Sequence, residues 1–345
     1  MVPGIGGVLV FVPQIALLFF FIGILEESGY MSRVVFIMDR LVRPFGLNGR
    51  SVVPLVSSAA CAVPGIMATR VISNPKERLI TILVSPLISC SARLPVFTLL
   101  IALVIPDETV WGFIGLRGLV MFGLYFLGIA GALLVSFVLK FILHAKEQSY
   151  LLLELPMYRI PRWKNIFLSL KEKVQVFIFD AGKIILAISI VLWALAYFPR
   201  AESNNAEVNQ LEQSYLGQAS QYIAPVFAPL GYDWKQTVAV LSSFAAREVF
   251  VGTMATLYST DEDFEGEETL LNRMKNDVNS ATRQPAYTLA SGLSLMVFYV
   301  FAMQCMATFA AVRRETGSWK YPIIQVAYMG ALAYLSALIT YHIFL

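Results

Sequence analysis

Six stretches of the chain are apolar over about 20 residues, the length that a helix needs to cross the hydrocarbon core of a bilayer. These stretches lie at 5–25, 79–105, 116–139, 174–198, 289–312 and 322–345. A further stretch, 28–44, carries four charged residues among apolar ones at roughly helical spacing, which is typical of an amphipathic helix in the membrane interface. The pattern predicts an all-α polytopic membrane protein with about six spanning helices.

Two other apolar segments are interrupted. Residues 51–69 carry no charge, but they are rich in Ser, Ala, Pro and Gly and too broken for an ordinary spanning helix. A weaker copy follows within 236–258: both segments contain a Ser-Ser pair and both close on Met-Ala-Thr. Two interrupted membrane segments in corresponding places of two halves are typical of a transporter, whose substrate site they form.

Lysine and arginine assign the loops to two sides of the membrane. Seventeen of them lie in 26–50, 70–78, 140–173 and 313–320, whereas 106–115, 199–235 and 259–285 hold five. The positive-inside rule makes the first set cytoplasmic and the second set external. Both flanks of 51–69 are then inside and both flanks of 236–258 are outside, so each segment must dip into the membrane and return.

The charge pattern therefore predicts an inverted repeat with two re-entrant, broken hairpins. We expect a first repeat over 1–139, a basic cytoplasmic linker over 140–173 and a second repeat over 174–345. Non-helical backbone at membrane depth requires cover by protein or water, because lipid cannot bond to free peptide groups. The two hairpins are accordingly predicted to meet inside the bundle, near the midplane.

Composition supports a membrane protein and gives no support to an enzyme. The 345 residues are 57% hydrophobic and 14% charged, against roughly 25% charged in soluble domains. The two histidines form no HExxH pair, and the chain has no GxxxxGK[ST] loop for a nucleotide phosphate. No motif indicates nucleic-acid binding. We expect a protein that is not an enzyme and whose main partner is the lipid bilayer.

Sulfur-bearing residues are the first candidate ligands. Cys61 lies in the first interrupted segment, while Cys90 and Cys305 take corresponding positions on the runs that follow the two hairpins. Met67 lies near them as a weaker ligand. Thiolate and thioether groups suit late or borderline divalent metals, although Cys and Met also fill gaps in tight helix bundles. The pattern favours a path for a soft metal ion and leaves the packing alternative open.

Ionisable residues inside apolar segments form a second set of candidates, because such residues are costly and need partners. Glu248 is interpreted as a carboxylate that attracts or gates a cation, or else as the partner of a facing arginine. The remaining five are predicted to have gating or structural polar roles. They are Arg93, Arg247, Glu27, Asp180 and Lys183, of which the last two form a possible ion pair one helical turn apart in 174–198.

Several blocks resemble the membrane region of the FeoB ferrous iron transporters. They are EESGYMSR at 26–33, CAVPGIMATR at 61–70, SCSARLP at 89–95, SSFAAREVF at 242–250 and RRETGSWK at 313–320. The resemblance implies two gate domains, related to those of nucleoside transporters, that move Fe2+ into the cytoplasm across a bacterial inner membrane. It also implies that Cys61 is the leading candidate for the iron path, with Cys305 and Cys90 as the family's other cysteines.

Two departures from the family pattern stand out. The usual first-gate motif resembles Gly-x-Gly-Cys-Asn-Val-Pro, whereas residues 59–64 read AACAVP and lack both glycines and the asparagine. Family members also carry an amino-terminal GTP-binding domain, which this sequence does not contain. The resemblance therefore implies that GTP acts only through that domain, in the same gene or a separate chain, with a small FeoA-like cytoplasmic protein as a further partner.

Two other functions remain open from the sequence. The chain could be a gate-fold carrier for a nucleoside or another organic solute, which would need polar and aromatic groups around the hairpins. It could also be a membrane scaffold or sensor that binds a soluble GTPase through 140–173 and transports nothing. The Ser and Cys content of the hairpins favours a metal over an organic solute.

Overall fold

The computed structural model describes residues 2–110, 114–143, 158–198, 214–244, 247, 249–258, 267–277 and 285–345. The chain forms two compact units. The first unit comprises Met1–Ser91, Gly128–Ala187 and Ala307–Gln325, and the second comprises Ala92–Leu127, Ile188–Met306 and Val326–Leu345. The two units are interleaved along the sequence, so the predicted repeats over 1–139 and 174–345 stay a prediction.

Membership of the units follows the predicted sides of the membrane. All four basic segments predicted to be cytoplasmic belong to the first unit, and all three segments predicted to be external belong to the second. The chain passes between the units near residues 91, 127, 187, 306 and 325, in each case inside or within one helical turn of a run that the sequence predicts to span. The distribution of charge and the division into units thus agree.

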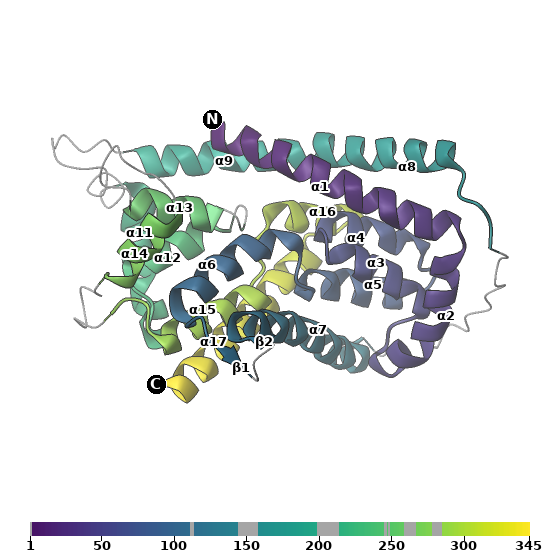
Figure 1. The fold of residues 1–345 in the computed structure, drawn as a ribbon. Helices are drawn as coiled ribbons and strands as arrows, with labels where there is room; N and C mark the ends of the chain where they lie inside the picture. Colours follow the sequence, from purple (N-terminus) through teal and green to yellow (C-terminus); the bar gives the residue numbers. More distant parts are fainter. Residues whose placement is uncertain are drawn as a thin grey trace. The chain divides into compact units, whose positions relative to one another are not determined.

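The helices of the first unit enclose the first interrupted segment. Figure 1 shows α1 (Val2–Glu27) lying along α8 (Trp163–Val176), and Gly23 lets the two approach at Ile166. The elements that follow α1 in this unit are α2 (Tyr30–Val42), η1 (Arg43–Phe45), η2 (Gly49–Ser51), α3 (Val52–Ser58), α4 (Ala62–Ala68), η3 (Thr69–Val71), α5 (Pro75–Val84) and η4 (Ser85–Leu87). A π-helical turn, η6 (Phe177–Gly182), follows α8, and α16 (Met306–Thr316) lies almost wholly in this unit.

The second unit is built around α15 (Leu289–Phe301), which is buried along nearly all of its length. Gly292 brings α15 against Val104 of α6 (Leu94–Val104). The other elements of this unit are β1 (Thr109–Val110), β2 (Ile114–Gly115), α11 (Tyr215–Phe227), η7 (Ala228–Leu230), α12 (Trp234–Ser242), α13 (Val249–Tyr258) and α14 (Glu267–Lys275). The two strands pair antiparallel, with Thr109 opposite Gly115 and Val110 opposite Ile114.

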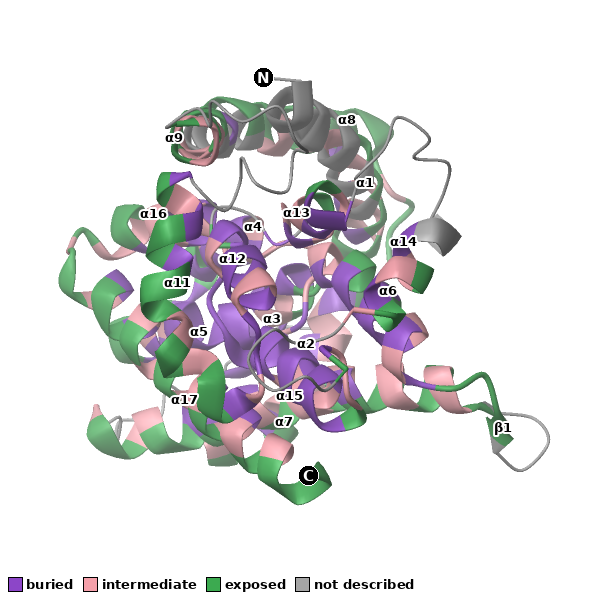
Figure 2. Cartoon of the chain, turned by 90° about the vertical axis from the view of Figure 1, so that its left-hand side faces the viewer, coloured by how far each residue is buried: buried purple, intermediate pink, exposed green. Residues whose placement is uncertain are grey.

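Besides α16, whose first residue belongs to the second unit, three described helices and one short turn run from one unit into the other. They are α7 (Leu116–Ile142), α9 (Lys183–Tyr197), α17 (Lys320–Phe344) and η5 (Ser91–Arg93). One stripe of α17 is buried at four-residue intervals, through Gln325, Met329, Ala333 and Ala337, while apolar side chains such as Ile339 are exposed elsewhere on it (Figure 2). An exposed apolar helix face is what contact with lipid requires.

The predicted fold class is confirmed. Among the described residues, four helical segments are long and apolar enough to cross a membrane: Pro75–Val104, Leu116–Ile142, Leu289–Thr316 and Lys320–Phe344. They correspond to four of the six predicted runs, and the runs 5–25 and 174–198 are helical too, in α1 and in the succession of α8, η6 and α9. The amphipathic helix expected over 28–44 forms as α2, with Met31 and Val35 buried and Ile37 exposed.

Candidate functional site

The chain enters each interrupted segment through the same turn. A short 3-10 helix containing a proline ends at Gly46 in the first unit and at Gly231 in the second, with φ of 80° and 77°. Only glycine adopts this left-handed conformation without strain. A residue two positions later, Asn48 or Asp233, then precedes the next helical turn. This turn recurs with a spacing of 185 residues, and the same spacing relates the two Ser-Ser pairs.

The first interrupted segment is a helical hairpin. Helices α3 and α4 pack against each other across a break at residues 59–61. Pro54 and Pro64 each stand in the first turn of their helix, where a missing N–H costs nothing. The Ser58 hydroxyl donates to the Pro54 carbonyl at 2.8 Å, which closes the end of α3. The predicted hairpin over 51–69 therefore forms with its break at Cys61.

The second hairpin repeats this arrangement. Helices α12 and α13 pack against each other, and Ser243 donates to the Ala239 carbonyl at 2.6 Å, the counterpart of the Ser58 bond. The Ser243 hydroxyl also lies 2.8 Å from the hydroxyl of Tyr299 on α15. Glu248, the predicted carboxylate of this hairpin, lies outside the described residues. Its role stays a prediction.

Each of the three cysteines lies immediately before a helical turn. Cys61 precedes α4, Cys90 precedes η5 and Cys305 precedes α16. All three side chains are partly exposed. The runs 79–105 and 289–312 were expected to be continuous helices, but the structure interrupts them at residues 88–90 and 302–305. The thiols at Cys90 and Cys305 thus adjoin non-helical backbone, as Cys61 does.

The physical reasons for the two interruptions differ. In the first run, Pro86 has no N–H to continue the ladder of α5, and the side-chain amide of Gln325 donates to the carbonyls of Leu83 at 2.8 Å and Ile82 at 3.4 Å. In the second run, the guanidinium of Arg247 donates to the carbonyls of Tyr299 at 3.2 Å and Ala302 at 3.0 Å. Side-chain donors therefore replace the backbone donors that each broken helix lacks.

Within the first unit, two of the interruptions are joined. The Ser91 hydroxyl donates to the Ala60 carbonyl at 3.0 Å, so the neighbour of Cys90 is bonded to the neighbour of Cys61. Both α3 and α4 also pack against η4. Met67 lies on α4 in the same hairpin. The structure thus places two of the predicted ligands beside a shared hydrogen bond.

The other two predicted ligands, Cys305 and Glu248, are not part of the first unit. Cys305 belongs to the second unit. Among the residues that the structure describes, no three Cys, His, Asp or Glu side chains gather closely enough to hold a metal ion. The predicted ligand set of Cys61, Cys90, Cys305, Glu248 and Met67 accordingly stays a prediction.

The predicted polar residues have varied surroundings. Arg247 is only 5% exposed, and its partners are the carbonyls at the end of α15, where a positive charge is favourable. Arg93 is fully buried directly before α6. Glu27 accepts a bond from the Asn165 side chain at 3.2 Å, which joins the end of α1 to α8 at the surface. Arg247 and Glu27 therefore have structural partners, whereas a gating role for either stays a prediction.

The ion pair predicted between Asp180 and Lys183 spans a change in helix type. Asp180 lies in the π-helical turn η6, and Lys183 begins α9. The Lys183 side chain is exposed, with its ammonium 5.9 Å from the ring centroid of Phe179. The i, i+3 geometry on which the pair was predicted belongs to an α-helix, not to a π-helical turn. The side chain of Asp180 lies outside the described part, so the pair stays a prediction.

Sequence reasoning did not single out three buried polar residues. Gln325 supports the break of α5, Glu315 pairs with two arginines, and Gln304 is buried beside Cys305 in the break between α15 and α16. The signal for Gln325 and Gln304 was present, because each amide interrupts an apolar run. A buried side-chain amide needs hydrogen-bond partners from the protein or from a ligand, so a glutamine inside an apolar run is as informative as a charged residue there.

The predicted external side carries its own polar cluster. The Lys235 ammonium bonds both carboxylate oxygens of Asp277, at 2.9 and 3.0 Å, and Tyr258 donates to the same carboxylate. Burial raises the pKa of the neighbouring Asp233 carboxyl above its ordinary value, although the backbone of Trp234 and the charge of Lys235 act in the opposite direction. This cluster ties the start of α12 to the segment after α14.

Comparison with known proteins identifies the family. The family model described as "Nucleoside recognition" (Gate) matches residues 8–104 and 178–319, and the model described as "Ferrous iron transport protein B C terminus" matches residues 121–173. Together these matches include both hairpins, all three cysteines and the predicted basic linker.

Curated relatives match over almost the whole chain. Fe(2+) transporter FeoB of Leptospira biflexa is 44% identical over 99% of this chain and 49% of its own length. Fe(2+) transporter FeoB of Staphylococcus aureus strain COL is 38% identical over 99% of this chain and 48% of its length. A Fe(2+) transport protein A/Fe(2+) transporter FeoB fusion protein of Porphyromonas gingivalis is also 38% identical, over 99% of this chain and 43% of its length.

The chain spans about half the length of these relatives. No solved structure matches it. The gate model nevertheless covers most of the chain in two stretches, and the ferrous iron transport model covers the segment between them. The chain therefore belongs to the gate, or nucleoside recognition, family and within it to the ferrous iron transport protein B type.

Proposed function

We propose that this chain is the membrane part of a transporter that moves Fe2+ into the cytoplasm, and that it is not itself an enzyme. The observation that carries the proposal is the position of the three cysteines, each at an interruption of a membrane helix. Interrupted helices form the substrate sites of many transporters, and thiol ligands suit Fe2+ better than Mg2+ or Ca2+. The names of the relatives support the same cargo.

The proposed path begins at the external side. The segment 259–285 is rich in Asp and Glu, and negative charge there would raise the local concentration of cations. The ion would then exchange water for the sulfur atoms of Cys61 and Cys90, helped by carbonyl oxygens that the interruptions leave outside the helix ladder. Met67 is a weaker ligand. Cys305 and Glu248 are the remaining proposed ligands.

The proposed partners lie outside this chain. A GTP-binding domain, in the same gene or in a separate chain, would supply the GTP dependence, because this sequence has no nucleotide-binding loop of the Walker type. A small FeoA-like protein is a second proposed partner, and the fusion of Fe(2+) transport protein A with FeoB in Porphyromonas gingivalis supports it. We place the chain in the bacterial inner membrane, where import to the cytoplasm requires it.

A second candidate function is the transport of an organic solute such as a nucleoside. Two observations favour it: the description of the matching gate model, and the buried polar side chains of Ser243, Tyr299 and Gln304 in the second unit. Hydroxyl and amide groups of this kind recognise the hydrogen-bonding edges of a solute. The sulfur atoms have no part in such a site, which separates this candidate from the first.

Anaerobic Fe2+ binding to the purified chain in detergent tests the proposal. Wild type is compared with Cys61→Ser, Cys90→Ser and Cys305→Ser, with Mg2+ as the control ion and a set of nucleosides as competing ligands. Saturable Fe2+ binding that weakens in Cys61→Ser and Cys90→Ser supports the iron path. Binding that ignores every cysteine, or thermal stabilisation by a nucleoside alone, overturns it in favour of the organic solute. If neither Fe2+ nor a nucleoside binds and the chain captures a soluble GTPase, the result indicates a membrane scaffold that transports nothing.

A further inference from the structure

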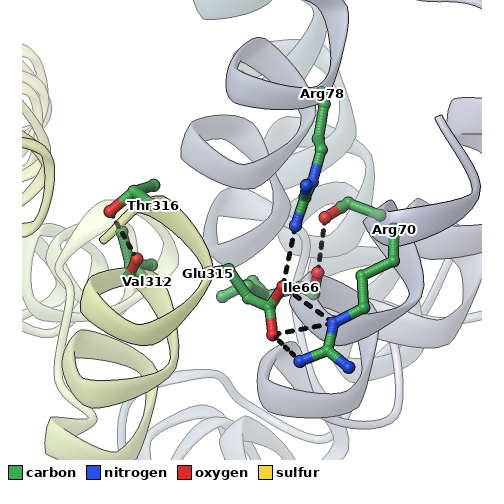
Figure 3. Close-up of polar contacts among 7 residues, drawn as sticks. Ile66, Arg70, Arg78, Val312, Glu315 and Thr316 are labelled. Atoms are coloured by element: carbon green, nitrogen blue, oxygen red, sulfur yellow. Dashed lines mark hydrogen bonds and ion pairs between the residues drawn. The ribbon is translucent and has the colours of Figure 1, made fainter. Parts of the chain in front are cut away.

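The carboxylate of Glu315 lies between two guanidinium groups. One of its oxygens accepts from Arg70 Nη2 at 2.6 Å, and the other accepts from Arg78 Nη2 at 2.8 Å and from Arg70 Nε at 3.0 Å. Figure 3 shows the carboxylate facing both arginines. The Glu315 side chain is only 2% exposed, and its carboxylate is covered by the two arginines.

The three residues come from elements that lead to or from the three cysteines. Arg70 lies in η3, which continues directly from α4, and α4 begins after Cys61. Arg78 lies on α5, which leads through η4 to the interruption at Cys90. Glu315 is on the last turn of α16, which begins after Cys305. One carboxylate therefore joins α4, α5 and α16 at their ends distant from the thiols.

Neighbouring bonds fix the ends of two of these helices. The Thr69 hydroxyl donates to the Ile66 carbonyl at 2.6 Å, and the Thr316 hydroxyl donates to the Val312 carbonyl at 2.7 Å (Figure 3). Arg313, another cation on α16, stacks on Trp319 with its guanidinium carbon 3.6 Å from the ring centroid. The backbone on both sides of the ion pair is thus held in place, and Arg313 has a partner of its own.

The two arginines differ in exposure. The Arg70 side chain is 54% exposed and that of Arg78 is 32% exposed, so water reaches the Arg70 bond more easily. A carboxylate as deeply buried as Glu315 is costly without a partner, and Arg78 supplies one if Arg70 leaves. The hydrogen bond to Glu315 raises the pKa of Arg70, whose guanidinium is charged at every physiological pH in any case. The bond between Arg70 and Glu315 can therefore open while the carboxylate keeps Arg78 as a charged partner.

We infer that Glu315 is a positioning residue: it clamps α4 and α5 to α16 at the predicted cytoplasmic side, and opening of its bond to Arg70 releases the first hairpin. This inference rests on the proposed function, because it concerns the hairpin that carries Cys61. Both segments that meet here, 70–78 and 313–320, are among those that the charge pattern assigns to the cytoplasm. The clamp would control how far the Cys61 and Cys90 interruptions open toward that side.

The clamp can be tested without iron, through the rate at which a maleimide reagent alkylates each cysteine of the purified chain in lipid nanodiscs. Peptide mass analysis distinguishes Cys61, Cys90 and Cys305. Arg70→Gln is expected to accelerate alkylation of Cys61 and Cys90 several-fold, and Arg70→Lys is expected to restore part of the protection. Arg313→Gln is the matched control, because it removes a cation of the same helix end that does not bond to Glu315.

Glu315→Gln and the double variant with Arg70→Gln complete a mutant cycle. If the two residues act as one clamp, the double variant changes the rate by less than the two single changes combined. Equal rates in wild type and Arg70→Gln overturn the inference, as does an equal acceleration by Arg313→Gln. Arg70→Gln is the milder change, since Arg78 still pairs with Glu315, so it remains informative if Glu315→Gln fails to fold. Failure of wild type to bind Fe2+ would count against the proposed function and leave this result intact.

Discussion

Gly65 of α4 lies so close to Ser58 of α3 that a methyl group on Gly65 would overlap the Ser58 hydroxyl oxygen. The same methyl group would come within 2.8 Å of the Pro54 carbonyl oxygen, which accepts the Ser58 hydrogen bond. Gly252 takes the equivalent place in the second hairpin and has no neighbouring atom within 4 Å of such a methyl group. Close approach of the helices therefore requires glycine in the first hairpin only.

Gly65→Ala is expected to destabilise the chain by about 1 to 3 kcal/mol, the usual cost of forcing an extra methyl group into a packed interior. Gly252→Ala is the matched control, and a gain of up to about 1 kcal/mol is expected because alanine favours the helix. Thermal unfolding in detergent measures both changes. Equal effects of the two substitutions would show that the hairpins are packed alike, contrary to the structure.

Arg247→Gln is expected to lower the free energy of unfolding more than the same substitution at a partly exposed arginine that also bonds to a carbonyl. The change removes donors from two buried carbonyls, each costing about 1 to 3 kcal/mol when left unsatisfied. Arg117 is the control: it donates to the Ile105 carbonyl at 3.2 Å, but its side chain is 38% exposed, so water can replace it. Unfolding temperatures of Arg247→Gln and Arg117→Gln that fall equally would contradict the buried role.

Gln325→Leu is expected to cost about 1 to 3 kcal/mol, because the carbonyls at the end of α5 lose a buried donor. Tyr334→Phe provides the comparison, since the exposed Tyr334 hydroxyl donates to the Val226 carbonyl at 2.9 Å. Its loss is expected to change stability little. The measurement is again thermal unfolding, with the maleimide reactivity of Cys90 as a local readout. A Gln325→Leu chain as stable as wild type would mean that the break is held by other groups.

Asp233→Asn is expected to change how stability depends on pH. Burial raises the pKa of Asp233, so the folded chain favours its protonated form; the contribution of this group to stability grows as pH falls and is lost as pH rises above the raised pKa. Asparagine, which stands at the equivalent Asn48, removes this dependence while preserving the turn. At about pH 7 the variant is expected to be at least as stable as wild type.

Unfolding temperatures of wild type and Asp233→Asn at about pH 7 and about pH 4.5 test this expectation. The difference between the two chains should shrink toward the lower pH, where wild type is protonated as well. Parallel pH profiles would show that Asp233 does not contribute.

The sequence was sufficient to predict the fold class and the positions of the two hairpins. Apolar length indicated the spanning runs, and the loops that the basic residues assign to the same side of the membrane fall in the same unit. The helix breaks at Cys90 and Cys305 could not be predicted, because an apolar run reads the same whether its helix is continuous or interrupted. The signal at Cys90 was Pro86, yet a proline is also tolerated in many membrane helices.

The partners of the buried polar residues could not be predicted from the sequence either. Arg247 bonds to backbone carbonyls, and an acceptor that every residue carries leaves no mark in a sequence. Glu315 meets Arg70 across 245 positions, and nothing in either neighbourhood identifies the other. The three cysteines, in contrast, stood out by their rarity, which is why the candidate ligands were found and their surroundings were not.

The amide of Gln325 has a consequence for how this protein can move. By bonding the carbonyls of Ile82 and Leu83, it holds the bend after α5 with a side chain from α17. If the proposed transport moves α5, we expect α5 and its bend to move together, with the hinge outside Val84–Leu87.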